Sequence, residues 1–124
     1  MKKISLLIVI LTISIGVAQA KKMPQPLGVI LQAFANYQCA DKTLLNVRYY
    51  VLSDKSLTFV KVNLNGKIYT LPQAVSGSGA KYSDDMYLTW WNKGNEGTVY
   101  EKNGGPEEDW PATHINCREI KKQT

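Results

Sequence analysis

The sequence contains a single histidine, His114, and few residues that could form a catalytic site with it. A serine hydrolase needs a histidine that is paired with a serine nucleophile and oriented by a carboxylate. Ser76, Ser78 and Ser83 are present, but none lies in the Gly-x-Ser-x-Gly turn that exposes such a nucleophile. We therefore expect His114 to be a structural or surface residue.

The acidic residues also lack the pattern of a glycosidase site. Such a site needs one desolvated carboxyl group and a second that stays ionised. Asp54, Asp84 and Asp85 fall in expected turns, and Glu107-Glu108-Asp109 is one run beside glycine and proline, so these side chains are expected to be solvated. The sequence has no phosphate-binding loop and no zinc-ligand spacing. We expect neither an enzyme nor a bound cofactor or metal.

The start of the sequence has the layout of a secretory signal peptide. Two lysines precede an apolar stretch over residues 4–17, and residues 18–20 (Ala-Gln-Ala) offer a cleavage site. The apolar stretch is too short to be read as a membrane span. Without residues 1–20, whose only charges are those two lysines, 13 of the 15 basic residues remain against 10 acidic ones, so the net charge falls from +5 to +3. This small excess argues against a dedicated nucleic-acid-binding protein.

Two cysteines, Cys39 and Cys117, lie near the two ends of the expected exported chain. In an oxidising compartment, an even pair of cysteines is most simply one disulfide. The chain-entropy estimate for closing so long a loop is about 4–5 kcal/mol of stabilisation. Lys21, and not a cysteine, follows the expected cleavage site, so we expect no lipid anchor.

Runs of β-branched and aromatic residues between turn signals predict an all-β domain. Asn65-Gly66 is the strongest hairpin signal, because both residues tolerate positive φ. Seven or eight short strands indicate a small antiparallel barrel or sandwich. We expect residues 1–20 to be the signal peptide, 21–33 an N-terminal arm with a helical turn around residues 29–34, and 34–124 the barrel domain.

Alternation in the expected strand over residues 86–93 predicts which side chains face the core. The face assigned to the core carries Met86, Leu88 and Trp90. The outer face carries Tyr87, Thr89, Trp91 and Lys93. Two interpretations of Trp91 stay open: it covers the end of the barrel, or it belongs to a binding surface beside the lysine.

Several short motifs occur in order along the sequence. They are Tyr37-Gln38-Cys39, Val47-Arg48-Tyr49, Leu71-Pro72, Ser78-Gly79-Ala80-Lys81-Tyr82 and Trp90-Trp91-Asn92-Lys93-Gly94, with Cys117 near the end. Together they resemble the bacterial inhibitors of C-type lysozyme, a family with membrane-bound and periplasmic members. Two departures from the pattern are Asp84-Asp85, where a turn glycine would be more usual, and the long segment 103–111.

The resemblance implies a β-barrel of about eight strands that enters the active-site cleft of an animal lysozyme and so protects bacterial peptidoglycan. It nominates Ser78, Gly79 and Tyr82 from one segment, and Lys93 and Gly94 from a second, as lysozyme-binding residues. A lysine ammonium suits an ionised carboxylate of the cleft, and a serine hydroxyl can donate or accept. The resemblance also implies a periplasmic location in a Gram-negative bacterium.

Alternatives remain at this point. Ser78 and Lys93 are ordinary turn residues if the barrel is instead a non-inhibitory periplasmic binding or structural module. Glu107, Glu108 and Asp109 either supply an acidic patch for a basic lysozyme or are solvated loop residues. The sequence leaves the oligomeric state open, including a homodimer.

Overall fold

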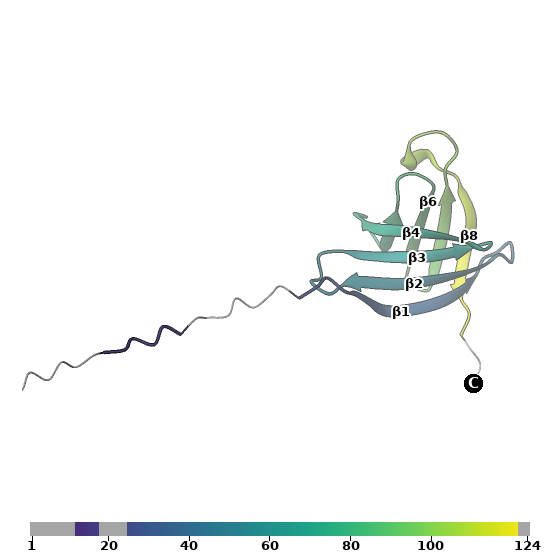
Figure 1. Ribbon diagram of the computed structural model, residues 1–124. Coiled ribbons are helices and arrows are strands. Elements are labelled where there is room, and N and C mark those ends of the chain that lie inside the picture. Colours follow the sequence, from purple (N-terminus) through teal and green to yellow (C-terminus); the bar gives the residue numbers. More distant parts are fainter. Residues whose placement is uncertain (1–11, 18–24, 122–124) are drawn as a thin grey trace, which may run out of the picture.

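Each strand pairs with the next one along the chain, and the last strand pairs with the first, so the sheet closes into a barrel (Figure 1). The computed structural model describes residues 12–17 and 25–121, of which 12–17 belong to no helix or strand. The elements are β1 (Val29–Gln38), β2 (Leu44–Leu52), β3 (Thr58–Leu64), β4 (Lys67–Ala74), β5 (Ala80–Ser83), β6 (Leu88–Lys93), β7 (Glu96–Glu101), the 3-10 helix η1 (Glu107–Asp109) and β8 (Ala112–Glu119). The expected antiparallel barrel of about eight strands is confirmed.

The expected β3–β4 hairpin is also present. Asn65 and Gly66 adopt φ values of 52° and 82°, and Leu64 pairs with Lys67 across the turn. Such a two-residue turn requires positive φ at both central positions, which glycine and asparagine adopt at the lowest cost.

The core is built by the alternate residues that point into the barrel. Its largest fully buried side chain is Trp90, whose ring meets the edge of Tyr37 at a centroid distance of 4.9 Å. The expected disulfide joins Cys39, just after β1, to Cys117 in β8. The remaining core residues are mainly Leu45, Val47, Val60, Val62, Leu64, Leu71, Tyr82, Leu88 and Val99.

The helical turn expected around residues 29–34 is wrong. β1 begins at Val29 and pairs with β2 from Leu52 backwards, with one irregularity between Leu31 and Ala33. β2 is long enough to offer backbone partners to the whole segment, and these ladder hydrogen bonds replace those of a helical turn. The rest of the expected signal peptide, residues 1–11 and 18–20, and its expected new N-terminus at Lys21 lie outside the described residues.

The barrel has two walls that cross. In Figure 1, β1 to β4 lie side by side, and β6 and β8 cross behind them at a steep angle. The β4–β5 loop and the β6–β7 turn lie at one end of the barrel, because strands alternate in direction. The β5–β6 and β7–β8 connections lie at the other end. Within the described residues, no helix is long and apolar enough to cross a membrane.

Candidate functional site

The β4–β5 loop, residues 75–79, carries Ser78 and turns back through Gly79. The Ser76 hydroxyl donates to the Gly79 carbonyl at 3.0 Å, which closes the loop on itself. Gly79 has φ of 65°, and a Cβ there would overlap the Asn92 carbonyl oxygen and lie 2.7 Å from Lys93 Cγ. Only glycine gives the loop both this conformation and this close approach to β6.

The second predicted segment is the tight β6–β7 turn. Lys93 pairs with Glu96 across the turn, and Gly94 has φ of 60°. Because Ala80 pairs with Asn92 in the β5–β6 ladder, the Ser78 loop and the Lys93 turn emerge beside each other. The structure thus brings together four of the five predicted residues, Ser78, Gly79, Lys93 and Gly94.

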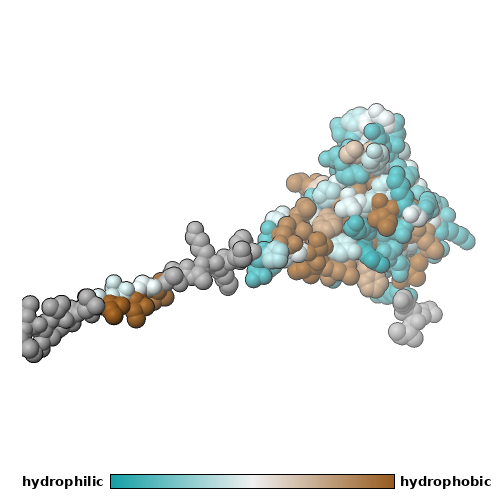
Figure 2. Space-filling model, viewed as in Figure 1, coloured by the Kyte–Doolittle hydropathy of each residue, from teal (hydrophilic) through white to brown (hydrophobic). Residues whose placement is uncertain are grey.

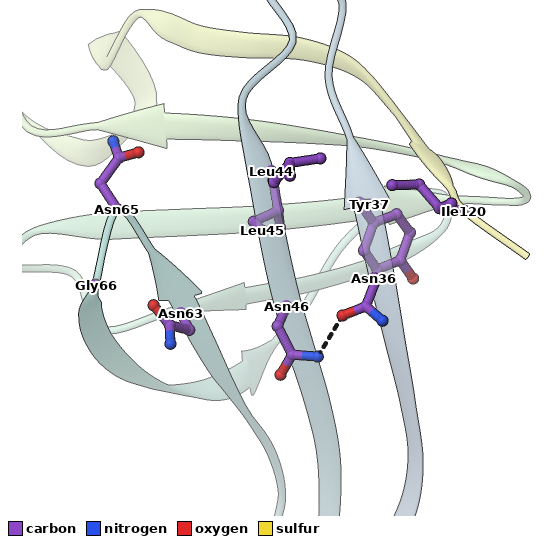
Figure 3. Close-up of a pocket in the computed structure, with 9 residues that line it drawn as sticks. All are labelled: Asn36, Tyr37, Leu44, Leu45, Asn46, Asn63, Asn65, Gly66 and Ile120. Atoms are coloured by element: carbon purple, nitrogen blue, oxygen red, sulfur yellow. Dashed lines mark hydrogen bonds between the residues drawn. The ribbon is translucent and has the colours of Figure 1, made fainter. Parts of the chain in front are cut away.

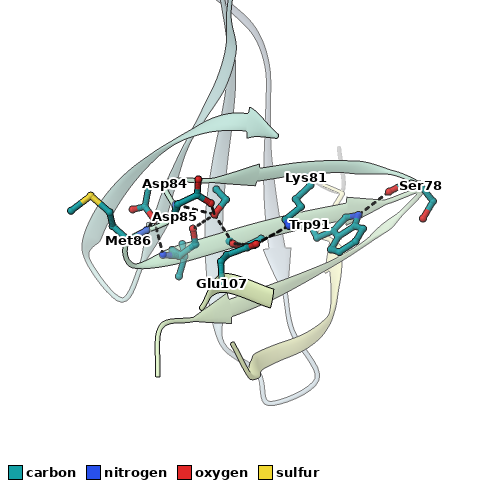
Figure 4. A network of polar contacts seen from close by, with 10 residues as sticks. Ser78, Lys81, Asp84, Asp85, Met86, Trp91 and Glu107 are labelled. Atoms are coloured by element: carbon teal, nitrogen blue, oxygen red, sulfur yellow. Dashed lines mark hydrogen bonds and ion pairs between the residues drawn. The ribbon is translucent and has the colours of Figure 1, made fainter. Parts of the chain in front are cut away.

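Trp91 links these two segments. Its indole N–H donates to the Ser78 carbonyl at 2.8 Å (Figure 4). The Lys93 ammonium lies 4.4 Å from the centre of the Trp91 ring, and the Lys81 ammonium lies 5.4 Å from it. Cations over an indole face are attracted by its negative quadrupole. Trp91 therefore belongs to the surface that holds Ser78 and Lys93, which favours the second of its two interpretations.

The fifth predicted residue, Tyr82, lies inside the barrel. Only 5% of it is exposed, and its ring meets Tyr49 edge-on at 5.8 Å. Burial raises the pKa of the Tyr82 hydroxyl above its usual value, and nearby Tyr49 adds to the effect. Tyr82 is thus a neutral side chain beneath the loop, with little surface to offer a partner.

A polar network in the barrel interior fixes the residue before Lys93. The Asn92 side chain donates to the Tyr37 hydroxyl at 3.2 Å, and that hydroxyl lies 3.0 Å from the Tyr49 hydroxyl. The Trp90 indole donates to Tyr49 at 3.2 Å. Burial, followed by the contact with Tyr49, raises the pKa of Tyr37 far above its usual value, so it stays protonated. The network anchors β6 from within while its outer face carries Trp91.

Glu107 in η1 is not the solvated residue that the sequence predicts. Its carboxylate pairs with Lys81 at 2.9 Å and accepts from the Thr89 hydroxyl at 2.9 Å, and its side chain is 20% exposed (Figure 4). The segment 103–111 is long enough to fold over the outer face of β5 to β7, where Lys81 and Thr89 point. Glu107, Glu108, Lys81 and Trp91 all line a cavity of about 210 Å³ there. Glu108 and Asp109 are exposed, as expected.

Burial in the expected strand over residues 86–93 differs from the prediction at Thr89 and Met86, for two different reasons. Thr89 does point outward, but it is only 1% exposed because η1 covers it. Met86 is 55% exposed and lies before β6, which begins at Leu88, so it is not a core residue. In the β5–β6 turn, Asp85 adopts φ of 54°, a conformation for which glycine would be more usual.

Asp84 stabilises that turn. Its Oδ1 accepts hydrogen bonds from the backbone N–H groups of Met86, Tyr87 and Leu88 at 2.8–3.1 Å. An aspartate that caps successive N–H groups shapes a turn without help from glycine.

His114 has a structural partner. Its Nδ1 lies 2.6 Å from Oδ2 of Asp41 in the β1–β2 connection, and no hydrogen bond joins it to a serine among the described residues. The same part of the chain contains no group of three or more His, Cys, Asp or Glu side chains that could hold a metal ion. His114 therefore joins β8 to the β1–β2 connection and has a structural role.

Sequence reasoning named Glu107 as a possible acidic residue of the binding surface but missed its contact with Lys81. The two are 26 residues apart, and the connection between them has no sequence signal. Only Lys81's position inside the Ser78–Tyr82 motif, one residue before Tyr82, placed it near the loop.

Comparison with known proteins shows the family of this chain. Residues 37–108 match the family described as "Membrane-bound lysozyme-inhibitor of c-type lysozyme". The chain belongs to this family. The matched segment contains all five predicted binding residues, and the family name describes inhibitors of an enzyme, in agreement with the expectation of a non-enzyme.

Three relatives carry the name "Membrane-bound lysozyme inhibitor of C-type lysozyme". The one from Pseudomonas aeruginosa is 34% identical over 84 residues, which cover 68% of this chain and 62% of that protein. The one from Yersinia enterocolitica is 44% identical over 52% of this chain and 50% of its own. The one from Escherichia coli is 35% identical over 53% of this chain and 55% of its own. The chain thus spans about half to three-fifths of the length of these relatives.

Proposed function

We propose that this protein inhibits C-type lysozyme by placing the Ser78 loop and the Lys93-Gly94 turn in the active-site cleft of the enzyme. The observation that carries the proposal is the adjacency of these two segments, held by the hydrogen bond from Trp91 to Ser78 and by the close approach of Gly79 to Asn92. The membership of the chain in the lysozyme-inhibitor family supports the same function.

The chemistry of the two segments suits a cleft that contains catalytic carboxyl groups, one protonated and one ionised. Lys93 is exposed and forms no ion pair among the described residues, so its ammonium remains available to an ionised carboxylate. The Ser78 carbonyl accepts a hydrogen bond from the Trp91 indole, but the Ser78 hydroxyl makes no hydrogen bond among the described residues. Both groups can therefore bind a partner without breaking a hydrogen bond or an ion pair of the described residues.

Rigidity is the second part of the proposal. Trp91 and Gly79 fix the outer side of the two segments, while Tyr82 and the Asn92 network support them from inside. A preorganised loop loses little conformational entropy when it enters a cleft, which favours tight binding. Tyr82 acts in this proposal as a support and not as a contact residue.

We also place the working protein in the periplasm. The Cys39–Cys117 disulfide needs an oxidising compartment, and the relatives' names place them at a membrane. An inhibitor in this compartment would meet lysozyme where the enzyme attacks peptidoglycan.

The experiment is a titration of lysozyme activity on bacterial cell walls with the purified protein and three alanine variants. Lys93→Ala should weaken inhibition most, by about 2–5 kcal/mol, because it strips a buried carboxylate of its partner. Ser78→Ala should cost about 0.5–1.5 kcal/mol. Lys102→Ala, which removes an exposed lysine at the opposite end of the barrel, should inhibit like the wild type.

Competition with a chito-oligosaccharide tests the cleft itself, since one slot does not hold both ligands. An inhibited complex that still binds the oligosaccharide with full affinity would contradict cleft insertion. Full lysozyme activity at a stoichiometric excess of the protein would contradict inhibition and leave the non-inhibitory module in its place.

A further inference from the structure

The outer face of β1, β2 and β3 carries a row of asparagines that the lysozyme site does not use. Asn36 is the register partner of Asn46, and Asn46 is the partner of Asn63, so the three amides lie across three neighbouring strands (Figure 3). They point outward because Tyr37, Leu45 and Val62, their neighbours along each strand, are buried.

Most of the hydrogen-bonding capacity in this row is unused. Asn46 Nδ2 donates to Asn36 Oδ1 at 2.8 Å, which fixes both amide planes. Among the described residues, the Asn36 Nδ2, the Asn46 Oδ1 and the whole Asn63 amide have no hydrogen-bond partner. The row thus presents both donors and acceptors at fixed positions.

A groove runs over the row. A cavity of about 450 Å³ is lined by the three asparagines together with Asn65, Leu44 and Ile120. A second cavity of about 140 Å³, lined also by Arg48 and Lys61, shares Asn46 and Asn63 with it. The larger volume is in the range of small-molecule sites.

Two further rows continue the same face. Arg48 pairs with Lys61, and Tyr50 pairs with Phe59, whose ring stacks on it at 5.2 Å with 15° between the planes. Rows on one face are about 7 Å apart, so amide, cationic and aromatic groups succeed one another over about 14 Å. The strands β1 to β4 form one wall of the barrel, and Figure 2 shows apolar surface gathered over this wall and interrupted by polar side chains.

The charge of this wall has one sign. The four strands β1 to β4 contain no Asp and no Glu at any position, whereas they contain Arg48, Lys61 and Lys67. Neither Arg48 nor Lys61 belongs to an ion pair in the described part of the chain. A ligand with negative charge would meet no repulsion on this wall.

We infer that this wall is a second binding site and that its ligand is an oligosaccharide bearing carboxylates. Sugar rings have apolar faces and hydroxyl edges, which match the Tyr50–Phe59 pair and the asparagine row. Arg48 and Lys61 supply charge-assisted hydrogen bonds to a carboxylate. The inference does not depend on lysozyme binding, because Ser78 and Lys93 lie outside this wall.

Other ligands fit less well. A peptide that adds a strand would pair at the edges of β1 and β4, which meet β8 and β5 over only two residue pairs each, and not on the outer face that carries the asparagine row. A nucleic acid that gains its affinity from phosphate contacts needs more cations than the two that line the groove.

The experiment follows the backbone and side-chain amide signals of the protein by NMR during titration with two carboxylated probes. One is tetragalacturonate, and the other is an N-acetylglucosaminyl-N-acetylmuramyl dipeptide, a fragment of peptidoglycan. Binding of either probe with saturable shifts at Asn36, Asn46 and Asn63 supports the site, and the stronger of the two identifies the source of the ligand. If neither probe shifts the signals of these residues at millimolar concentration, the proposed site is wrong.

Three comparisons sharpen the result. The double variant Arg48→Gln/Lys61→Gln should bind the carboxylated probe about tenfold more weakly or worse. The control Lys102→Gln should bind the probe like the wild type. Both variants should inhibit lysozyme like the wild type. Equal binding of neutral chitotetraose would overturn the role of the carboxylates. Tighter binding of a thymidine oligonucleotide, or burial of the wall in a homodimer, would overturn the saccharide assignment.

Discussion

The indole N–H of Trp91 in β6 donates to the backbone carbonyl of Ser78, 13 residues earlier in the chain, at 2.8 Å. This contact ties the β4–β5 loop to the strand that ends at Lys93, whose ammonium lies over the same indole ring. One side chain thus sets the position of both segments that we propose to enter the lysozyme cleft.

Trp91→Phe should therefore weaken inhibition about two- to twelvefold, because it removes one hydrogen bond that contributes about 0.5–1.5 kcal/mol. The phenyl ring keeps a face for Lys93 but cannot donate to Ser78. Trp110→Phe is the matched control, because it removes an indole hydrogen bond to the Gly105 carbonyl in the β7–β8 connection. Inhibition constants and thermal unfolding of both variants are the measurements. Equal loss of inhibition in the two variants would show that general destabilisation, and not loop position, is responsible.

Gly79→Ala should disturb the site more than any other conservative change in the loop. The residue has positive φ, and the added Cβ would overlap the Asn92 carbonyl oxygen, a backbone atom that cannot turn away. We expect a loss of stability of more than about 1 kcal/mol and a large loss of inhibition. Gly77→Ala is the control, because a Cβ there meets nothing within 4 Å. Wild-type inhibition by Gly79→Ala would contradict the proposed packing of the loop on β6.

The barrel was predictable because its signals are local. Asn65-Gly66 marks a hairpin through the φ values of two adjacent residues, and the two cysteines leave only one intramolecular pairing. The resemblance in ordered motifs also located the segments around Ser78 and Lys93. These motifs do not reveal that Tyr82 faces the barrel interior, because a motif records residue types and not burial.

Contacts between distant segments escaped prediction. Glu107 follows a glycine-rich stretch that is typical of a solvated loop, yet η1 folds back and places it on Lys81 and Thr89. Alternation correctly put Thr89 on the outer face, but no local pattern shows that another segment covers that face. Met86 was misassigned because Asp84 and Asp85 extend the turn to the start of β6.

The two neighbouring glutamates of η1 should now behave differently. Glu107→Gln removes the charge that pairs with partly buried Lys81, and we expect it to lower the free energy of unfolding by about 1–2 kcal/mol. Glu108→Gln should leave stability unchanged, because that side chain is exposed. If the loop assists encounter with a basic lysozyme, Glu108→Gln and Asp109→Asn should slow association at low salt and leave dissociation unchanged. Stopped-flow binding at two ionic strengths and urea unfolding test both statements, and equal unfolding midpoints for Glu107→Gln and the wild type would contradict the first.

Acid should weaken the connection between β1 and β2 through Asp41. The Thr43 backbone N–H, followed by the contact with His114, lowers the pKa of the Asp41 carboxyl below its ordinary value of 3.8. A carboxyl group whose pKa is lower in the folded state contributes stability above the unfolded pKa, and this stability is lost as the pH falls through the folded pKa. Asp54 has a lowered pKa as well, because Ser56 donates to it through both its hydroxyl and its N–H.

Asp41→Asn should therefore reduce the loss of stability below about pH 4. The double variant Asp41→Asn/Asp54→Asn should reduce it further, because the two carboxyls lie in separate turns and their effects should add. The measurement is the urea midpoint of the wild type, the two single variants and the double variant from neutral pH to about pH 2. Asp41→Asn should also be less stable than the wild type at neutral pH, because the ionised Asp41 carboxylate of the wild type accepts the Thr43 N–H. An acid limb in Asp41→Asn as steep as that of the wild type would show that Asp41 does not hold the lowered pKa in solution.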